Sequence, residues 1–266
     1  MDVDSGRSSG FVSRSIPEAY ETYLAPQLFA PWADKLLERA SLPRGATVLD
    51  VASGTGVVAR AASEWIGETG RVTACDISES MLARVGPGVV PLEGAAERLP
   101  LPAASQDVVL CQQGLQFFRD RSAALAEMYR VLRPNGTLGV AVWAAEQPLG
   151  LFGPMTQALQ AAIPPPIPGA FDLSSYAMAA EDLSAALDRA GFEGIEVETL
   201  QLTAVWASME DALATIYGSL FGPPFAALPP TDQEQVQRAF GNGLAPDWHG
   251  GSVSVDTYAH IARARK

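Results

Sequence analysis

Short apolar runs alternate with helical periodicities through the first half of the chain. Apolar residues recur at helical spacing over Ser15–Ala40, where Pro26 and Pro31 are expected to interrupt the helix. Apolar runs then predict strands at Thr47–Val51, Gly70–Asp76, Val89–Leu92, Ser105–Gln113 and Thr137–Trp143. The segments between them predict helices at about Gly56–Ile66, Ser78–Arg84 and Ser122–Leu132, and a turn at Arg133–Gly136. This alternation predicts an α/β fold with a parallel, doubly wound sheet.

The pattern changes after Trp143. Ile163–Phe171 is a proline-rich connection between segments of mainly helical character. Helices are predicted at Met155–Ala162, Glu181–Ala190, Met209–Leu220 and Asp232–Phe240, and two further strands at Gly194–Trp206 and Val253–Ala264. We expect disorder over residues 1–14 and a single domain over 15–266, with a core at about 40–145 and helical lid segments at about 145–180 and 206–250.

Charge and composition narrow the function. The 266 residues carry a formal net charge of −12, which argues against binding nucleic acid. No apolar run approaches the length of a membrane span, and the polar start lacks a signal-peptide core, so we expect a cytoplasmic protein. Cys75 and Cys111 are expected to be free, buried thiols, and the basic ending Arg263–Lys266 to be solvated.

The glycine-rich turn after the first strand is the main candidate site. Gly54 and Gly56 match the glycine fingerprint of dinucleotide-binding folds, but several cofactors use such a turn. Asp50, just before the turn, would repel a pyrophosphate and suits a ligand with an ammonium or sulfonium charge. Asp76 can accept both hydroxyls of a ribose, and Met81 can pack on adenine. The alternatives are a buried cap for Asp50, a helix N-cap for Asp76 and core packing for Met81.

Five motifs in order resemble the class I S-adenosylmethionine-dependent methyltransferases, in the small-molecule branch related to the quinone C-methyltransferases. They are VLDVASGTG at 48–56, CDISESML at 75–82, GAAERLPLPAASQDVV at 94–109, LQFFRD at 115–120 and EMYRVLRPNGTLGVAVW at 127–143. The resemblance covers about Ile16–Trp143 and is loose beyond it. It implies a Rossmann-like, seven-stranded mixed sheet in the order 3-2-1-4-5-7-6, with the last strand antiparallel and helices on both faces.

The resemblance also implies residues that bind S-adenosyl-L-methionine. The methionine part would contact Tyr20, Asp50, Ala52, Ser53, Gly54, Gly56, Cys111 and Gln112; the ribose would contact Asp76; and the adenine would contact Ile77, Met81, Ala95 and Ala96. Ala52 replaces the first turn glycine of the family. Ala95 replaces an aspartate that bonds the adenine amino group, a loss of about 1.5–3 kcal/mol.

The acceptor site is expected beside the cofactor. Gln113, Gln116, Phe117, Phe118, Trp143 and Phe152 are the candidates for orienting the acceptor and walling its pocket. The lid segments are rich in Ala, Leu, Phe and Pro, which favours an apolar small molecule.

A general base is needed only for a weak nucleophile, because the methyl donor is already activated. His249 is the candidate base; Asp247 and Tyr20 are weaker ones, and a structural role is favoured for His260. No residue is assigned to a metal.

Methyl transfer to an apolar small molecule, in secondary metabolism, is the leading hypothesis. Three alternatives stay open at this point: cyclisation or another rearrangement of a natural product on the same fold, a non-catalytic partner subunit, and an NAD-dependent oxidoreductase. The last is disfavoured by the position of Asp50 and by the absence of a lysine near the turn.

Overall fold

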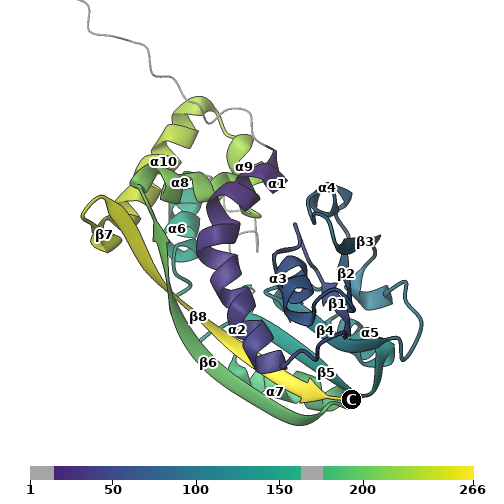
Figure 1. The fold of residues 1–266 in the computed structure, drawn as a ribbon. Coiled ribbons are helices and arrows are strands. Elements are labelled where there is room, and N and C mark those ends of the chain that lie inside the picture. The colour runs from purple at the N-terminus through teal and green to yellow at the C-terminus, as the bar shows by residue number, and fades with distance from the viewer. Residues whose placement is uncertain (1–14, 163–175) are drawn as a thin grey trace, which may run out of the picture.

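A computed structural model describes residues 15–162 and 176–266 of the chain. The expected disorder at 1–14 and the proline-rich connection at 163–171 lie outside these residues. Figure 1 shows a curved sheet with helices on its faces and a group of helices, α1, α8, α9 and α10, at the same end of the molecule as α4. Because α4 directly follows strand β2, this is the end where the parallel strands finish.

The sheet has the predicted order. Its strands are β1 (Thr47–Val51), β2 (Arg71–Asp76), β3 (Val89–Glu93), β4 (Gln106–Gln112), β5 (Leu132–Trp143), β6 (Glu193–Trp206), β7 (Trp248–His249) and β8 (Ser252–Arg265). The order is β3-β2-β1-β4-β5-β8-β6, with the two-residue β7 paired to β8. Strands β1 to β5 are parallel, and β8 runs antiparallel to both β5 and β6. The seventh long strand is therefore β8, and the expected mixed sheet is confirmed.

Each face of the sheet has its own apolar core. The helices are α1 (Ile16–Ala19), η1 (Tyr20–Phe29), α2 (Ala30–Ala40), α3 (Val57–Ile66), α4 (Glu79–Leu82), η2 (Ala96–Arg98), η3 (Leu115–Phe117), α5 (Arg121–Val131), α6 (Phe152–Ala162), α7 (Ala180–Arg189), α8 (Met209–Gly218), α9 (Gly222–Ala226), α10 (Pro230–Leu244) and η5 (Ala245–Asp247). Val48 and Leu110 face α2 and α3, whereas Leu49 and Val109 face α5 and α7. Successive strand residues thus supply opposite layers.

Two local expectations about proline are wrong. Residues 16–40 are continuously helical, because Pro26 is accommodated in the π-helical η1 and Pro31 lies in the first turn of α2, where its missing N–H is not needed. The predicted turn at Arg133–Gly136 is an irregularity inside β5: the pairing with β4 jumps from Leu132 to Thr137. Asn135 does adopt a positive φ there, at 65°.

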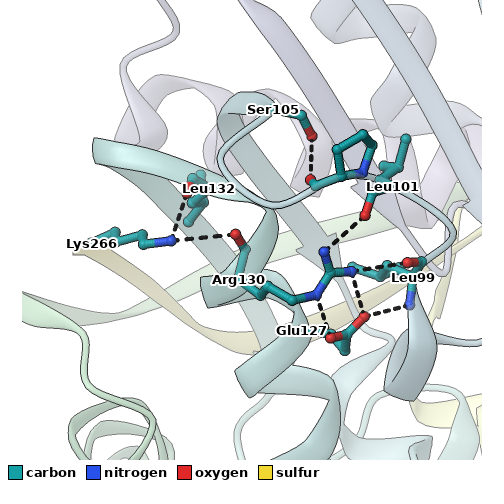
Figure 2. A network of polar contacts seen from close by, with 8 residues as sticks. Leu99, Leu101, Ser105, Glu127, Arg130, Leu132 and Lys266 are labelled. Carbon is teal, nitrogen blue, oxygen red and sulfur yellow. Dashed lines mark hydrogen bonds and ion pairs between the residues drawn. The ribbon is translucent and has the colours of Figure 1, made fainter.

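The basic ending is solvated only in part: Arg265 is exposed as expected, whereas Arg263 and Lys266 are partly buried. Strand β8 includes Arg263 and Arg265, and the Lys266 ammonium donates to the carbonyl oxygens of Arg130 and Leu132 at 3.3 and 2.8 Å (Figure 2). It also lies 4.7 Å from the centre of the Tyr129 ring. The end of the chain is therefore fixed against α5 and the start of β5. Cys75 and Cys111 are free and buried, as predicted.

Candidate functional site

A cavity of about 900 Å³ lies at the carboxyl ends of β1, β2 and β4. The sheet and its loops line it with Ala52, Gly54, Asp76, Ile77, Met81, Gly94, Ala95, Ala96, Glu97, Gln112, Gln113, Gly114, Phe117, Phe118, Arg119, Asp120 and Trp143. The helices at this end add Ile16, Tyr20, Leu24, Phe29, Phe152, Gly218, Ser219, Leu220 and Pro223. The space lies where ligands bind in open α/β sheets, next to the point at which the strand order reverses.

The turn after β1 exposes its backbone to the cavity. Ala52, Gly54 and Gly56 all have positive φ, at 56°, 55° and 86°. A Cβ on Gly54 would have no other atom within 4 Å, whereas one on Gly56 would lie 3.0 Å from the Val85 side chain. Gly54 thus leaves room for a ligand, and Gly56 allows close packing within the protein.

Asp76 joins this turn to the end of β2. Its carboxylate accepts hydrogen bonds from the backbone amides of Gly54 and Ser78, at 2.8 and 2.9 Å. The N-cap of α4 is Ser78, whose side chain accepts from the Met81 amide. Asp76 lines the cavity, so its carboxylate, which has lone pairs beyond those two bonds, can accept hydrogen bonds from a ligand there.

Asp50 lies behind the turn and not in the cavity wall. The side chain is buried, and one carboxylate oxygen has no hydrogen-bond partner among the described residues. Burial raises the pKa of Asp50 to about 8; the backbone amide of Ala59 in α3 opposes this shift, and the charge of Asp76 adds to it. The hydrogen bond that the Ala59 amide donates to Asp50 agrees with the alternative that Asp50 serves as a buried cap.

Three more of the expected cofactor residues do not line the cavity. Ser53 and Gly56 belong to the turn but face the protein interior, and Cys111 is fully buried with its pKa raised to about 12, first by that burial. Of the residues in this turn, Ala52 and Gly54 alone line the cavity.

The residues expected around adenine lie together. Ile77, Met81, Ala95 and Ala96 all line the cavity, and Ile77 is 73% exposed. The loop that carries Ala95 and Ala96 is held from outside by α5: the Leu99 amide donates to Glu127, and Arg130 donates to the carbonyl oxygens of Leu99 and Leu101 (Figure 2). The position of this wall therefore depends on an ion pair that does not itself reach the cavity.

The π-helix η1 forms another wall. Tyr20, Leu24 and Phe29 all line the cavity, and the rings of Tyr20 and Phe29 stack with centroids 5.1 Å apart. In an α-helix of about 3.6 residues per turn, positions 20 and 29 would fall on opposite sides. The wider π-winding, with i→i+5 hydrogen bonds, returns them to one side. Phe29 was missed from the sequence because it does not share an α-helical face with Tyr20; Leu24, four residues after Tyr20, shares that face in either winding and was not singled out.

Glutamines stand at the carboxyl end of β4. Gln112 and Gln113 line the cavity. Gln112 Nε2 donates to the Phe29 carbonyl at 2.9 Å, and its Oε1 has no partner in the part of the chain that the structure describes. Gln116 is 3% exposed and does not line the cavity, which does not support its expected role in binding the acceptor.

Aromatic rings close the side opposite the adenine residues. Trp143 contacts Phe29 and Phe152, with ring centroids 6.2 and 6.1 Å apart. Phe117, 44% exposed, stands at the rim with its ring 5.4 Å from that of Tyr176. From the helices at this end, these expected wall residues are joined by five further residues that the sequence did not single out: Ile16, Gly218, Ser219, Leu220 and Pro223. They come from segments far apart in the chain, and no local motif marks them.

Neither histidine lies in the cavity. His249 is exposed on β7, at the left edge of Figure 1, so the structure does not bring this candidate base to the site. His260 is 2% exposed and bonded through both ring nitrogens, to Thr199 Oγ1 at 2.8 Å and Glu146 Oε2 at 2.9 Å, which is the structural role favoured above. Residues 15–162 and 176–266 contain no cluster of three or more potential metal ligands among His, Cys, Asp and Glu. None of the helices in these ranges has the length and apolarity needed to span a membrane.

Sequence relatives identify the family. A family model described as a methyltransferase domain matches residues 49–140. The ubiquinone/menaquinone biosynthesis C-methyltransferase UbiE of Escherichia coli is 32% identical over 192 residues, which cover 64% of this chain and 75% of UbiE. The chain belongs to the class I S-adenosylmethionine-dependent methyltransferases. S-adenosylmethionine is accordingly its cofactor, and its substrate is a small molecule.

Solved structures show the same fold. A putative methyltransferase from an antibiotic biosynthesis pathway of Anabaena variabilis matches with a TM-score of 0.64 and 18% identity, over 90% of this chain and 98% of that one. The [4+2]-cyclase SpnF matches with a TM-score of 0.57 and 22% identity, over 89% and 80%. Identities this low support the methyltransferase fold and say nothing of the acceptor.

The cavity fits the cofactor of this family. Gly54 leaves space that a side chain would fill, the Asp76 carboxylate is available on the cavity side, and the half-buried Gln112 has an unpartnered amide oxygen. Gly54 thus offers exposed backbone to the cofactor, Asp76 can accept hydrogen bonds from its hydroxyls, and Gln112 can accept one from its ammonium group.

Proposed function

We propose that this protein transfers the methyl group of S-adenosylmethionine to an apolar small molecule held in the same cavity. The observation that carries the proposal is the composition of the cavity: the region after β1 and β2 presents Gly54, Asp76 and Met81, and the end of β5 and the start of α6 present Trp143 and Phe152. A cavity of about 900 Å³ is large enough for a cofactor and a drug-sized acceptor together. The cofactor supplies a methyl group already activated by a sulfonium charge.

The cofactor roles follow the positions of the side chains. Asp76 would accept the ribose hydroxyls, and Ile77 and Met81 would pack on the two faces of adenine, with Ala95 and Ala96 at its edge. The backbone at Ala52 and Gly54 and the amide of Gln112 would hold the methionine part. Tyr20 would donate there, because burial raises the pKa of its hydroxyl far above the usual range and keeps the proton in place.

The acceptor would need no histidine to activate it. Among the described residues, the titratable side chains that line the cavity are Tyr20, Asp76, Glu97, Arg119 and Asp120. Tyr20 keeps its proton, and Asp120 caps α5 through the amide of Ala123. The protein would therefore act by aligning the acceptor and excluding water, which is sufficient for in-line transfer to a good nucleophile.

The biological setting remains a proposal. A role in secondary metabolism is proposed with the small-molecule acceptor, a cytoplasmic location from the polar start of the sequence, and the absence of nucleic acid among the partners from the net charge of −12. The competing proposal is a rearrangement on the same fold; its support is the lack of a histidine or cysteine among the described lining residues and the likeness to a protein described as a [4+2]-cyclase.

Asp76→Ala tests the cofactor assignment. We expect it to abolish measurable binding of S-adenosylhomocysteine in isothermal titration calorimetry, because it removes the ribose acceptor and frees two backbone donors. Circular dichroism should show an intact fold. The matched control is Asp182→Ala, a carboxylate in the first turn of α7, which should bind normally. Unchanged affinity in Asp76→Ala would show that the ribose lies elsewhere.

A second measurement separates the two proposed activities. The purified protein would be titrated with S-adenosylmethionine, S-adenosylhomocysteine and NAD, and then assayed for methyl transfer to apolar phenols, quinones and polyketides. Failure to bind either sulfur compound would refute the cofactor pocket. Binding without any methyl transfer would favour the rearrangement.

A further inference from the structure

The side chain of Gln113 is buried at the cavity with none of its hydrogen bonds made. It is 6% exposed, and both Oε1 and Nε2 lack a partner among the described residues. The neighbouring Gln112 has one unpartnered amide atom among the described residues, its Oε1, which the ammonium group of the cofactor would occupy. Both residues line the cavity. More than about 90% of buried polar groups in proteins have a partner, so the two exceptions in the side chain of Gln113 need an explanation.

The backbone at Gln113 is also strained. Its φ is +44°, in the left-handed region that residues other than glycine rarely adopt. A hydrogen bond from its amide to the Ala141 carbonyl, 2.8 Å long, holds it there. Strained backbone that the surrounding structure holds in place is found mainly at binding and catalytic sites. Burial without partners and backbone strain thus coincide at one lining residue.

The rest of this wall is mainly apolar: of its two hydroxyls, that of Tyr20 is assigned above to the methionine part, and that of Ser219 already donates to the Ile216 carbonyl at 2.8 Å. Leu24, Phe29, Trp143 and Phe152 line the same cavity and offer no hydrogen bonds apart from the indole N–H of Trp143. The exposed Arg119 and Asp120 reach the cavity from the loop before α5, where solvent screens their charges. With the amide of Gln112 holding the methionine part of the cofactor, a ligand in the apolar part meets the uncharged amide of Gln113 as its principal polar contact.

We propose that Gln113 binds a neutral head group of the methyl acceptor that presents a hydrogen-bond donor and an acceptor side by side. A primary amide offers an N–H and a C=O oxygen in one plane, so its complement is a group that does the same, such as a hydroxyl next to a carbonyl. A charged head group would be buried here without a counter-ion, which is costly. The inference deepens the proposed function and rests on it for the placement of the acceptor.

The test uses four probes that share a naphthalene ring. They are 2-naphthamide (neutral, donor and acceptor), 2-methylnaphthalene (apolar), 2-naphthoate (anion) and 2-naphthylmethylamine (cation). Each is titrated into the full chain saturated with S-adenosylhomocysteine. We expect 2-naphthamide to bind about tenfold more tightly than 2-methylnaphthalene, and both ions to bind more weakly than 2-naphthamide.

Two substitutions assign the preference to Gln113. Gln113→Leu should abolish the preference for 2-naphthamide and keep or increase the affinity for 2-methylnaphthalene. Gln113→Glu should reverse the order of 2-naphthamide and 2-naphthylmethylamine, which a loss of packing alone would not do. Gln106→Leu is the matched control, because Gln106 is a buried glutamine with an unpartnered Oε1 at the opposite end of β4.

A failure of this inference gives a different result from a failure of the proposed function. If the unmodified chain does not bind S-adenosylhomocysteine, the proposed cofactor pocket is refuted. Normal cofactor binding with no difference among the four probes, whether all bind or none does, overturns the inference. So does a preference for 2-naphthamide that persists in Gln113→Leu, or tighter binding of either ion. Cofactor affinity and melting temperature of both variants show that the site is otherwise intact.

Discussion

Asp50 shows how one buried carboxylate links pH to stability. Its pKa in the folded chain, about 8, lies above the ordinary value of 3.8. Between about pH 4 and pH 8 the folded chain therefore binds more protons than the unfolded chain, and the free energy of unfolding falls as the pH rises. The slope is at most about 1.4 kcal/mol per pH unit for one group.

Asp50→Asn should flatten this dependence. Asparagine stays neutral throughout and can still accept the Ala59 amide, so the variant should gain stability relative to the unmodified chain as the pH rises from 5 to 8. Urea unfolding at several pH values measures this. Asp107→Asn is a control of opposite sign: burial raises the pKa of Asp107, but the Thr47 amide and Arg133 outweigh this and hold it below the usual range. Parallel pH curves for Asp50→Asn and the unmodified chain would contradict the prediction.

Single residues were predictable where a motif carried them. Gly54, Asp76 and Met81 lie at the cavity because the order strand, turn, strand, helix fixes their neighbourhood locally. His249 was chosen for its chemistry alone, and its place depends on the β7–β8 hairpin, which leads it away from the site. Gln116 shows the same limit: its position after β4 was correct, but the direction of its side chain was not predictable.

Among the elements, η1 depends most on its surroundings. Its π-winding brings Tyr20, Leu24 and Phe29 to the cavity, and α8 packs directly on its start. A Cβ on Gly218, the last residue of α8, would lie 2.4 Å from the backbone nitrogen of Tyr20. Local sequence predicts a helix broken by proline; neither the π-winding nor the close approach to α8, about 200 residues further along the chain, could be read from it.

Gly218→Ala should therefore displace η1. Because the clash is with backbone atoms, we expect a loss of about 1–3 kcal/mol in the free energy of unfolding and weaker cofactor binding through Tyr20. Gly241→Ala in α10 is the matched control, because the nearest atom to its Cβ would be Leu213 Cδ2 at 3.8 Å. Gly241→Ala should leave the free energy of unfolding unchanged or raise it by up to about 1 kcal/mol. Equal stabilities for the two variants would show that the contact between α8 and η1 can relax.

In the whole molecule, the cavity is shared between the sheet and the helices at its carboxyl end. Arg60 of α3 connects these two sides. Its guanidinium donates to the carbonyl oxygens of Thr55, in the turn after β1, and Arg84, and forms an ion pair with Glu21 of η1 at 3.0 Å. One side chain thus fixes the cofactor turn and holds the N-terminal helix over it.

Breaking this link should weaken cofactor binding more than it weakens the fold. The side chains of Arg60 and Glu21 are about one-third exposed, so Glu21→Gln should lower the affinity for S-adenosylhomocysteine only about two- to fivefold. Arg60→Met also removes the bonds to both carbonyls and should lower it about tenfold or more. Calorimetric titration with S-adenosylhomocysteine measures both changes in affinity. The controls are Arg39→Met and Glu198→Gln, which break a comparable ion pair between α2 and β6 that does not line the cavity. If the two controls lower the affinity as much as Glu21→Gln and Arg60→Met do, the contacts of Arg60 have no specific role at the site. The two sides of the cavity would then be held together by apolar packing alone.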